Sequence, residues 1–151
     1  MSETVDITTL PGIAVMRGFL DGSVPPPGAL TLLGMRMVSA EIGSVTMSLN
    51  PGPHHANPMG VMHGGILATL LDSVMGCSVH STLPAGRIYT TLEIKVNYLR
   101  GVTPSTGTIT ATGTVVHAGR RSAVAEARVT DAAGKLIATA STTCLIMETA
   151  A

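Results

Sequence analysis

A single carboxylate interrupts an otherwise uncharged stretch of the sequence. Asp72 lies within residues 64–81, a mostly apolar run that follows a polar segment rich in proline and glycine. Apolar surroundings cost an ionised carboxylate several kcal/mol unless a partner compensates. A carboxylate in such a place is suited to act as a general base or as a nucleophile.

The residues just before this stretch offer complementary chemistry. His63-Gly64-Gly65 stands where a helix should begin, and the N–H groups of a first helical turn have no partner within the helix. Glycine also lets another group come close to the backbone. These N–H groups and the positive helix end suit a carbonyl oxygen that gains negative charge during a reaction. We therefore expect Gly64 N–H to be an oxyanion donor.

The spacing of these two groups points to a second copy of the chain. Asp72 follows Gly64 by eight residues, which is roughly 12 Å along a helix. One helix cannot easily bring both groups to one carbon atom, whereas two antiparallel copies can. Small residues flank Asp72 on its helix face and would let another helix approach; these are Gly65, Ala68, Thr69 and Gly76. The alternative is that they are filler and that Asp72 is a partly solvated edge residue.

The spacing of the polar residues resembles the signature of hotdog-fold acyl-CoA thioesterases, in particular the phenylacetate-degradation (PaaI-like) type and the related 4-hydroxybenzoyl-CoA thioesterases. The residues that carry the resemblance are Asn57, Gly60, His63, Gly64, Gly65 and Asp72. The order of predicted elements matches from about residue 27 to residue 147. The resemblance implies an α+β hotdog fold, with an antiparallel β-sheet wrapped around one long central α-helix.

Thioester hydrolysis needs an oxyanion donor, a group that activates water or attacks directly, and a grip on CoA. Gly64 and Asp72 fit the first two needs. The resemblance places Asn57 beside Gly64 and opposite the other chain's Asp72, where its amide would position water or the thioester. The alternative for Asn57 is an ordinary loop residue. His63 would either bind the acyl carbonyl or hold the loop, and we favour the loop because its neighbour already supplies a donor.

A compact basic turn, Gly119-Arg120-Arg121, lies between two predicted strands. Arginine binds phosphate through its planar fork, and CoA carries a pyrophosphate and a ribose phosphate. The resemblance places this turn near the CoA nucleotide, and the alternative is an exposed hairpin with solubilising charges. Because CoA belongs to the substrate, no cofactor is expected.

Two further residues are expected to contact the substrate, Thr91 and Gly65. Thr91 is predicted on the polar side of its strand, where by resemblance a hydroxyl helps to hold the water. The alternative is a plain strand threonine. His54, His55 and His63 suggest a metal site, but their spacing matches no common zinc pattern. We therefore expect no metal.

The elements that position these residues can be predicted from periodicity and turn signals. A long helix should cover residues 64–81, with shorter helical segments at 11–21 and 28–33 and a frayed start over 1–9. Strands are expected at 35–40, 44–49, 87–99, 107–117, 122–130 and 135–147. Long strands without βαβ alternation indicate α+β with an antiparallel sheet. We divide the chain into an N-terminal segment, 1–26, and a hotdog thioesterase domain, 27–151.

Composition excludes several classes of protein. The 151 residues are 45% hydrophobic and 12% charged with a formal net charge of zero, which argues against nucleic acid as a partner. Low charge and the small-residue helix face predict a homodimer, assembled further into a homotetramer. Two cysteines, Cys77 and Cys144, are too few for a disulfide framework. No signal peptide or transmembrane run is visible, so we expect a cytoplasmic protein without membrane contact.

Two other functions remain open from the sequence. A hotdog dehydratase uses a catalytic histidine with an acid on the helix, or an Asp-x4-His pattern. The fifth residue after Asp72 is Cys77, so that pattern is missing, while His80 lies near the helix end. A non-catalytic acyl-CoA-binding module would keep the fold and lose the acid, which is present here.

Overall fold

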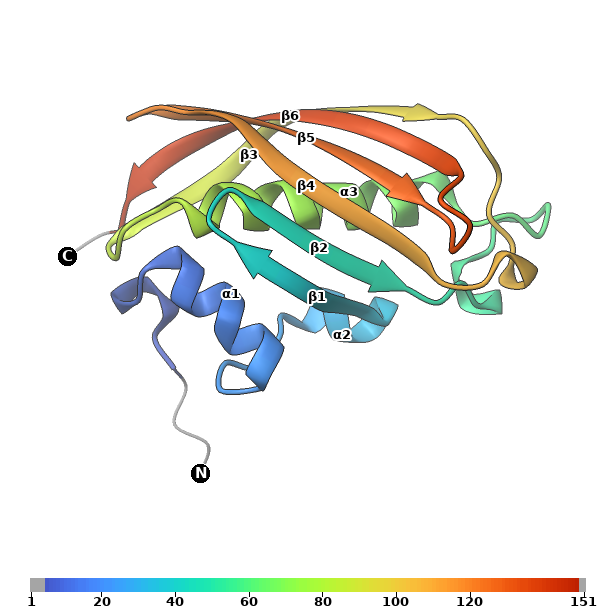
Figure 1. Ribbon diagram of the computed structural model, residues 1–151, viewed down its shortest axis with the longest axis horizontal. Helices are drawn as coiled ribbons and strands as arrows, with labels where there is room; N and C mark the ends of the chain where they lie inside the picture. The colour runs from blue at the N-terminus through green and yellow to red at the C-terminus, as the bar shows by residue number, and fades with distance from the viewer. Residues whose placement is uncertain (1–4, 150–151) are drawn as a thin grey trace.

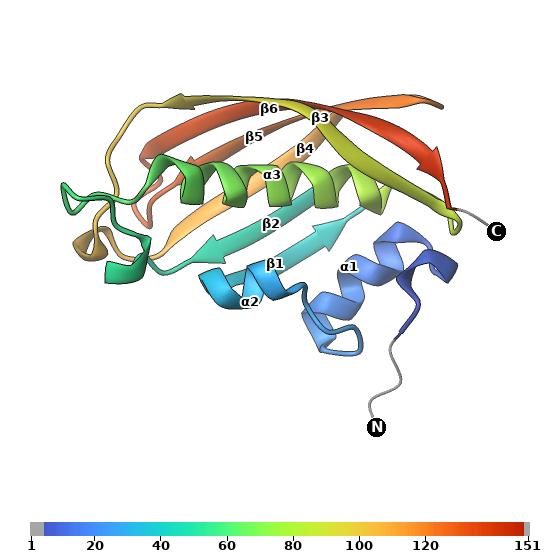
Figure 2. The same ribbon diagram turned by 180° about the vertical axis from the view of Figure 1, so that it is seen from behind.

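One long helix held within a curved sheet dominates the computed structural model, which describes residues 5–149. Helix α3 (Gly64–Ser81) runs along the inner face of a six-stranded antiparallel sheet with the order β1-β2-β4-β5-β6-β3 (Figures 1 and 2). The strands are β1 (Met35–Glu41), β2 (Ser44–Leu49), β3 (Arg87–Tyr98), β4 (Ile109–Ala118), β5 (Ser122–Thr130) and β6 (Leu136–Glu148). The α+β hotdog prediction is confirmed, and no predicted end of α3 or a strand is off by more than two residues.

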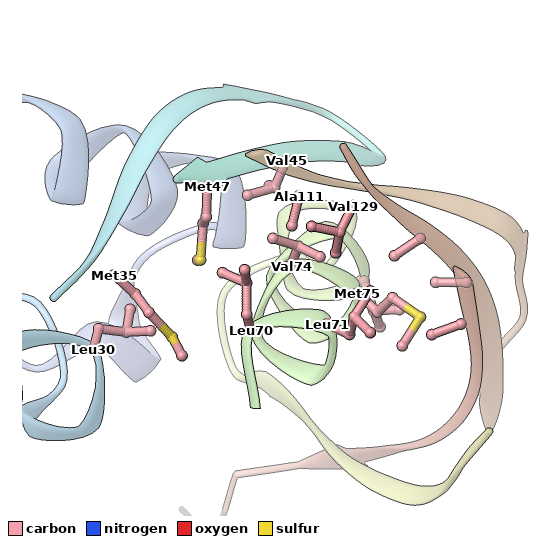
Figure 3. Packing of buried hydrophobic residues seen from close by; sticks show 14 of the residues in the cluster. Leu30, Met35, Val45, Met47, Leu70, Leu71, Val74, Met75, Ala111 and Val129 are labelled. Carbon is pink, nitrogen blue, oxygen red and sulfur yellow. The ribbon is translucent and has the colours of Figure 1, made fainter. Parts of the chain in front are cut away.

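The sheet wraps closely around α3 because the central strands present small side chains to it. Ala111 and Gly113 of β4 and Ala123 and Ala125 of β5 are buried. A Cβ atom at Gly113 would lie 2.5 Å from the Val74 carbonyl oxygen, so glycine lets the helix backbone touch the sheet. The larger core side chains lie around this contact, and Figure 3 shows them: Met35, Val45, Met47, Leu70, Leu71, Val74, Met75 and Val129.

Two buried serines fasten the β1–β2 hairpin to the second half of α3. The Ser78 hydroxyl accepts the N–H of Val45 at 3.1 Å, and the Ser81 hydroxyl accepts the N–H of Gly43 at 2.8 Å. Each hydroxyl also donates to a carbonyl of its own helix. The hydroxyls of these two serines, which are buried between helix and sheet, are therefore hydrogen-bonded. Their bonds to the hairpin fix the position of α3 along it.

The N-terminal segment packs on the same core. It contains a 3-10 turn, η1 (Ile7–Thr9), and the helix α1 (Gly12–Asp21), and a second helix, α2 (Gly28–Leu33), follows it before β1. The predicted fraying is wrong for η1, because the Asp6 carboxylate accepts the N–H of Thr8 and caps the turn; residues 1–4 lie outside the described residues. The division at residue 26 stays a prediction. Between residues 5 and 149, none of the helices has the length and hydropathy needed to cross a membrane.

Strand β3 lies at an edge of the sheet and carries a bulge. Its pairing with β6 shifts by one residue between Thr91 and Glu93, so Leu92 is the extra residue. The shift changes which side chains face α3: Tyr89 and Thr91 do so before the bulge, and Tyr98 does so after it. Simple alternation places Leu92 toward the core and Thr91 away from it. Both placements are wrong, and Leu92 is 59% exposed.

Candidate active site

The segment that leads into α3 is a closed loop built around Asn57. Ala56 and Met62 form an antiparallel bridge, and the N–H of Asn57 donates to the Val61 carbonyl at 2.7 Å. The side-chain oxygen of Asn57 accepts the N–H groups of Met59 at 2.9 Å and Val61 at 3.2 Å. These two donors fix the amide orientation, because only an oxygen can accept them. The amide NH2 is therefore the part of Asn57 that remains for a ligand.

His63 caps the start of α3. Its Nδ1 accepts the N–H of Gly65 at 2.9 Å, and its carbonyl accepts the N–H groups of Ile66 at 2.9 Å and Leu67 at 3.3 Å. Within residues 5–149, Gly64 is left as the one residue of the first turn whose N–H has no hydrogen-bond partner. The cap is a loop-holding contact of the kind favoured from the sequence. Gly65, in contrast, uses its N–H inside the protein, and its contact with substrate stays a prediction.

Tyr98 of β3 holds the same turn from the opposite side. Its hydroxyl donates to the Gly64 carbonyl at 2.8 Å, and a Cβ atom at Gly64 would lie 3.3 Å from its ring. Gly64 and Tyr98 border a hollow of about 320 Å³ that is otherwise mostly apolar, with Leu67, Leu99 and Arg100 among its lining residues. Sequence reasoning missed Tyr98 as a site residue, because it stands 34 residues from Gly64 and only the fold brings the two together.

Asp72 is held by one hydrogen bond from the sheet. The Thr91 hydroxyl donates to the Asp72 carboxylate at 2.9 Å, and both side chains are half-buried. Asp72 stands eight residues beyond Gly64 on an unbroken helix, so the two lie roughly 12 Å apart along its axis. One chain therefore carries two separate sets of polar groups, the Asn57 amide and Gly64 N–H near the helix start and the Asp72 carboxylate with the Thr91 hydroxyl further along.

Gly76, one of the small residues near Asp72, makes room for a tyrosine side chain of the same chain rather than for a second helix. A Cβ atom at Gly76 would overlap the Tyr89 hydroxyl, because the Tyr89 ring crosses the helix there. The expectation that Gly76 lies open to another helix is therefore wrong. The Tyr89 side chain therefore occupies the space beside Gly76.

Neither cysteine offers a competing nucleophile beside Asp72. Burial, with a smaller contribution from the Asp72 charge, raises the pKa of the Cys77 thiol to about 12. Burial likewise raises the pKa of the Cys144 thiol, and both cysteines are free. Both thiols therefore stay protonated at neutral pH, when a thiolate would be the reactive form.

The histidines do not form a pair with Asp72 or a metal site. His80 is the second-last residue of α3. Its ring centroid lies 5.8 Å from that of Tyr89, and burial lowers the pKa of its imidazole. Both ring nitrogens of His55 are hydrogen-bonded to backbone groups, so neither is free for a metal. Within the part of the chain that the structure describes, three potential metal ligands do not converge anywhere.

The arginine turn connects β4 to β5. The N–H of Gly119 donates to the Ser122 carbonyl at 2.8 Å, and a Cβ atom at Gly119 would lie 2.9 Å from that oxygen, so glycine permits the tight turn. Arg120 and Arg121 are exposed. A third arginine, Arg87 of β3, donates from its guanidinium to the Arg120 carbonyl at 2.7 Å. Sequence reasoning missed Arg87, because only the fold brings it to this turn.

Comparisons with known proteins agree with this geometry. The family model described as "Thioesterase superfamily" matches residues 59–138. A 1,4-dihydroxy-2-naphthoyl-CoA hydrolase from Listeria monocytogenes is 28% identical over 73% of this chain and 88% of its own length. The family match includes α3, the strands β3, β4 and β5, and the start of β6.

Solved structures show the same fold. A putative thioesterase from Ralstonia eutropha, described as phenylacetic acid degradation-related, is 27% identical and superposes with a TM-score of 0.79 over 87% of this chain and 98% of its own. A Streptococcus mutans protein bound to acetyl CoA is 30% identical, with a TM-score of 0.70 over 78% of this chain and 91% of its own. Since the family model also covers more than half of the sequence, the chain belongs to the thioesterase superfamily and is a thioester hydrolase.

Proposed function

We propose that the protein hydrolyses an acyl-CoA or aryl-CoA thioester to the free acid and CoA. The observation that carries the proposal is the pair of polar groups on α3. One is the Gly64 N–H at the helix start, which has no partner among residues 5–149, and the other, two turns on, is the Asp72 carboxylate held by Thr91. The Listeria relative is named for an aryl-CoA substrate, and the Streptococcus protein was solved with acetyl CoA. Both support CoA as the thiol half of the substrate.

Each step of the reaction has a group to serve it. As a general base, Asp72 takes a proton from water while the water oxygen attacks the thioester carbon. As a nucleophile, its carboxylate attacks that carbon itself, and water then hydrolyses the mixed anhydride. Either way the carbonyl oxygen becomes an oxyanion that accepts the Gly64 N–H, and the CoA thiolate leaves and takes up a proton. The chemistry requires neither a metal nor a cofactor.

The complete site belongs to two chains in this proposal. Strand β3 is an edge strand with exposed apolar side chains, Leu92 (59%) and Tyr98 (53%), and Leu99 follows it (58%). An unpaired edge is a template for pairing with another strand. Antiparallel pairing of two β3 strands about a twofold axis would place the two α3 helices side by side in opposite directions. Gly64 and Asn57 of one chain would then face the other chain's Asp72, and two such dimers would form the tetramer.

The arginine turn supplies the grip on CoA. Arg120 and Arg121 are exposed on a turn whose backbone is held by Arg87 and by the N–H of Ile146. The planar fork of a guanidinium group matches the geometry of phosphate oxygens. We assign the nucleotide of CoA to this turn.

The test replaces Asp72 by asparagine, which keeps the size and removes the charge. The turnover number kcat should fall by on the order of 10²–10⁴, the span for loss of a general base. The KM for acyl-CoA should change little, because Gly64 and the arginine turn remain. Release of CoA is followed with a thiol-trapping dye over a panel of acyl-CoA and aryl-CoA esters.

Asp131→Asn is the matched control for this charge change. Asp131 lies in the β5–β6 turn, where its side-chain oxygen accepts the N–H groups of Ala133 and Lys135 at 2.9 Å each. An amide oxygen can accept both bonds, so this variant should keep its activity. Full activity in Asp72→Asn would remove the catalytic role of the carboxylate.

A further inference from the structure

His55 is a buried histidine that the proposed reaction does not use. It ends the 3-10 turn η2 (Pro53–His55) and is only 2% exposed. Its Nδ1 accepts the N–H of Gly52 at 3.0 Å, and its Nε2 lies 3.0 Å from the carbonyl oxygen of Leu33. A carbonyl oxygen only accepts and a backbone N–H only donates. Both bonds can therefore form together in only one protonation state of the His55 ring. That state is the neutral imidazole with its proton on Nε2.

The backbone of the same residue reaches the start of α3. The carbonyl of His55 accepts the N–H of His63 at 2.7 Å. His63 is the cap residue, and the next residue is Gly64. The segment from His55 to His63 thus closes on itself, with Asn57 inside it. Any movement of His55 is therefore passed to both Asn57 and Gly64.

The far end of this connection is anchored in the core. Leu33 is the last residue of α2, between buried Leu30 and buried Met35 at the start of β1. The imidazole bridges 22 residues of sequence to reach it. Its side chain ties the closed loop to α2 through a buried imidazole and the carbonyl of half-buried Leu33.

We infer that His55 is a positioning residue, which sets the location of the Gly64 N–H and the Asn57 amide by tying the loop to the end of α2. The inference rests on the proposed function, because that function assigns the Gly64 N–H and the Asn57 amide their roles in the reaction. His55 touches neither substrate nor reacting atoms in this scheme. Its effect is to hold the donor where the oxyanion forms, and small displacements of such groups cost large factors in rate.

Two substitutions separate the bonds of the imidazole. In His55→Asn the shorter amide reaches the place of Nδ1, so it can accept the Gly52 N–H but cannot reach Leu33. In His55→Gln the amide nitrogen reaches the place of Nε2 and can still donate to Leu33. We expect His55→Asn to lower kcat by about 10- to 100-fold with little change in KM, as for a misplaced group. His55→Gln should retain most of kcat.

The neighbouring His54 provides a matched control. Its ring packs at a tilt against that of His55 with centroids 3.9 Å apart, but it is exposed, and the bond to Leu33 comes from His55. His54→Gln should keep the kcat of the unmodified protein. A kcat in His55→Asn equal to the unmodified value would overturn the inference, as would an equal loss in His55→Asn and His55→Gln.

Amide hydrogen exchange tests the same inference without activity. The amide of His63 should exchange faster in His55→Asn than in the unmodified protein, by about tenfold or more, the factor that corresponds to 1.4 kcal/mol. The amide of Leu71, deep in α3, should be unchanged. Unchanged exchange at His63, or equal acceleration at both residues, contradicts a positioning role. If the unmodified protein hydrolyses no CoA ester, the proposed function fails, while this exchange result still decides whether His55 holds the helix start.

Discussion

At the scale of single residues, the candidate site depends on which hydrogen-bonding positions of each polar group are still free for a substrate. The side-chain oxygen of Asn57 accepts an N–H of its own loop, and the N–H of Gly65 donates to the ring of His63. Both are therefore partly occupied before a substrate arrives. Gly64 N–H, the Asn57 NH2 and the Asp72 carboxylate keep capacity for a ligand, since Thr91 fills only one of the several acceptor positions of the carboxylate.

The Thr91 hydroxyl should matter through Asp72. Thr91→Val keeps the shape and removes the donor, so the carboxylate loses its only recorded hydrogen bond within residues 5–149. A hydrogen bond to a charged group contributes about 1.5–3 kcal/mol, and about 1.4 kcal/mol is tenfold in rate. We expect kcat to fall about tenfold or more with KM little changed. Thr91→Ser restores the hydroxyl and should restore kcat; failure of that rescue would mean that packing, rather than the bond, was lost.

At the scale of elements, the fit between α3 and the central strands sets where Asp72 lies. The closest approach is at Gly113 of β4, where the helix backbone near Val74 leaves no space for a side chain. Both Asp72 and Val74 belong to the same helical turn. We therefore expect a substitution that pushes α3 away from β4 to act first on the stability of the fold and only through it on the position of Asp72.

Gly113→Ala tests this contact. Overpacking a core typically costs about 1–3 kcal/mol, and here the obstacle is backbone, which cannot rotate away. The free energy of unfolding from urea titration should fall by that amount. Gly28→Ala is the control, because Gly28 also lies in an α-helix but a Cβ atom there would meet nothing within 4 Å. Equal urea midpoints for Gly113→Ala and the unmodified protein would show that α3 does not press on β4.

The β4–β5 turn should act on binding rather than on chemistry. Changing Arg120 and Arg121 to alanine should raise KM for acyl-CoA more than it lowers kcat, because phosphate contacts lie far from the reacting carbon. The effect should be smaller on an acyl-pantetheine that lacks the nucleotide. Arg128→Ala, which removes an exposed arginine of β5 outside the turn, is the control. Equal losses on both substrates would argue against a nucleotide site.

At the scale of the whole molecule, the proposed site needs two copies in antiparallel contact. Mixing an inactive Asp72→Asn chain with an inactive Asn57→Ala chain gives heterodimers with one intact site and one site that lacks both groups. Partial activity should return after the two chains are refolded together, while each variant alone stays inactive. No recovery in well-mixed heterodimers would place both groups in one chain. Light scattering that found only monomer at micromolar concentration would also exclude the shared site.

The sequence by itself determined the elements and the chemical groups of this protein. Periodicity and turn residues specify six strands and one long helix, because the pattern of apolar residues fixes which face each element can bury. The same local chemistry marks Gly64 at the helix start, and the lone Asp72 stands out by its charge. The rise of about 1.5 Å per helical residue separates these two groups by roughly 12 Å, without any knowledge of tertiary contacts.

The tertiary structure decided which residues serve those groups. A bulge at Leu92 turns Thr91 toward Asp72, and a one-residue register shift leaves no mark in an alternating sequence. Tyr98 meets Gly64 across 34 residues. His55 meets Leu33 across 22 residues, and Arg87 meets Arg120 across 33. Such contacts arise from packing and register between distant segments, whereas composition and spacing describe only neighbours along the chain.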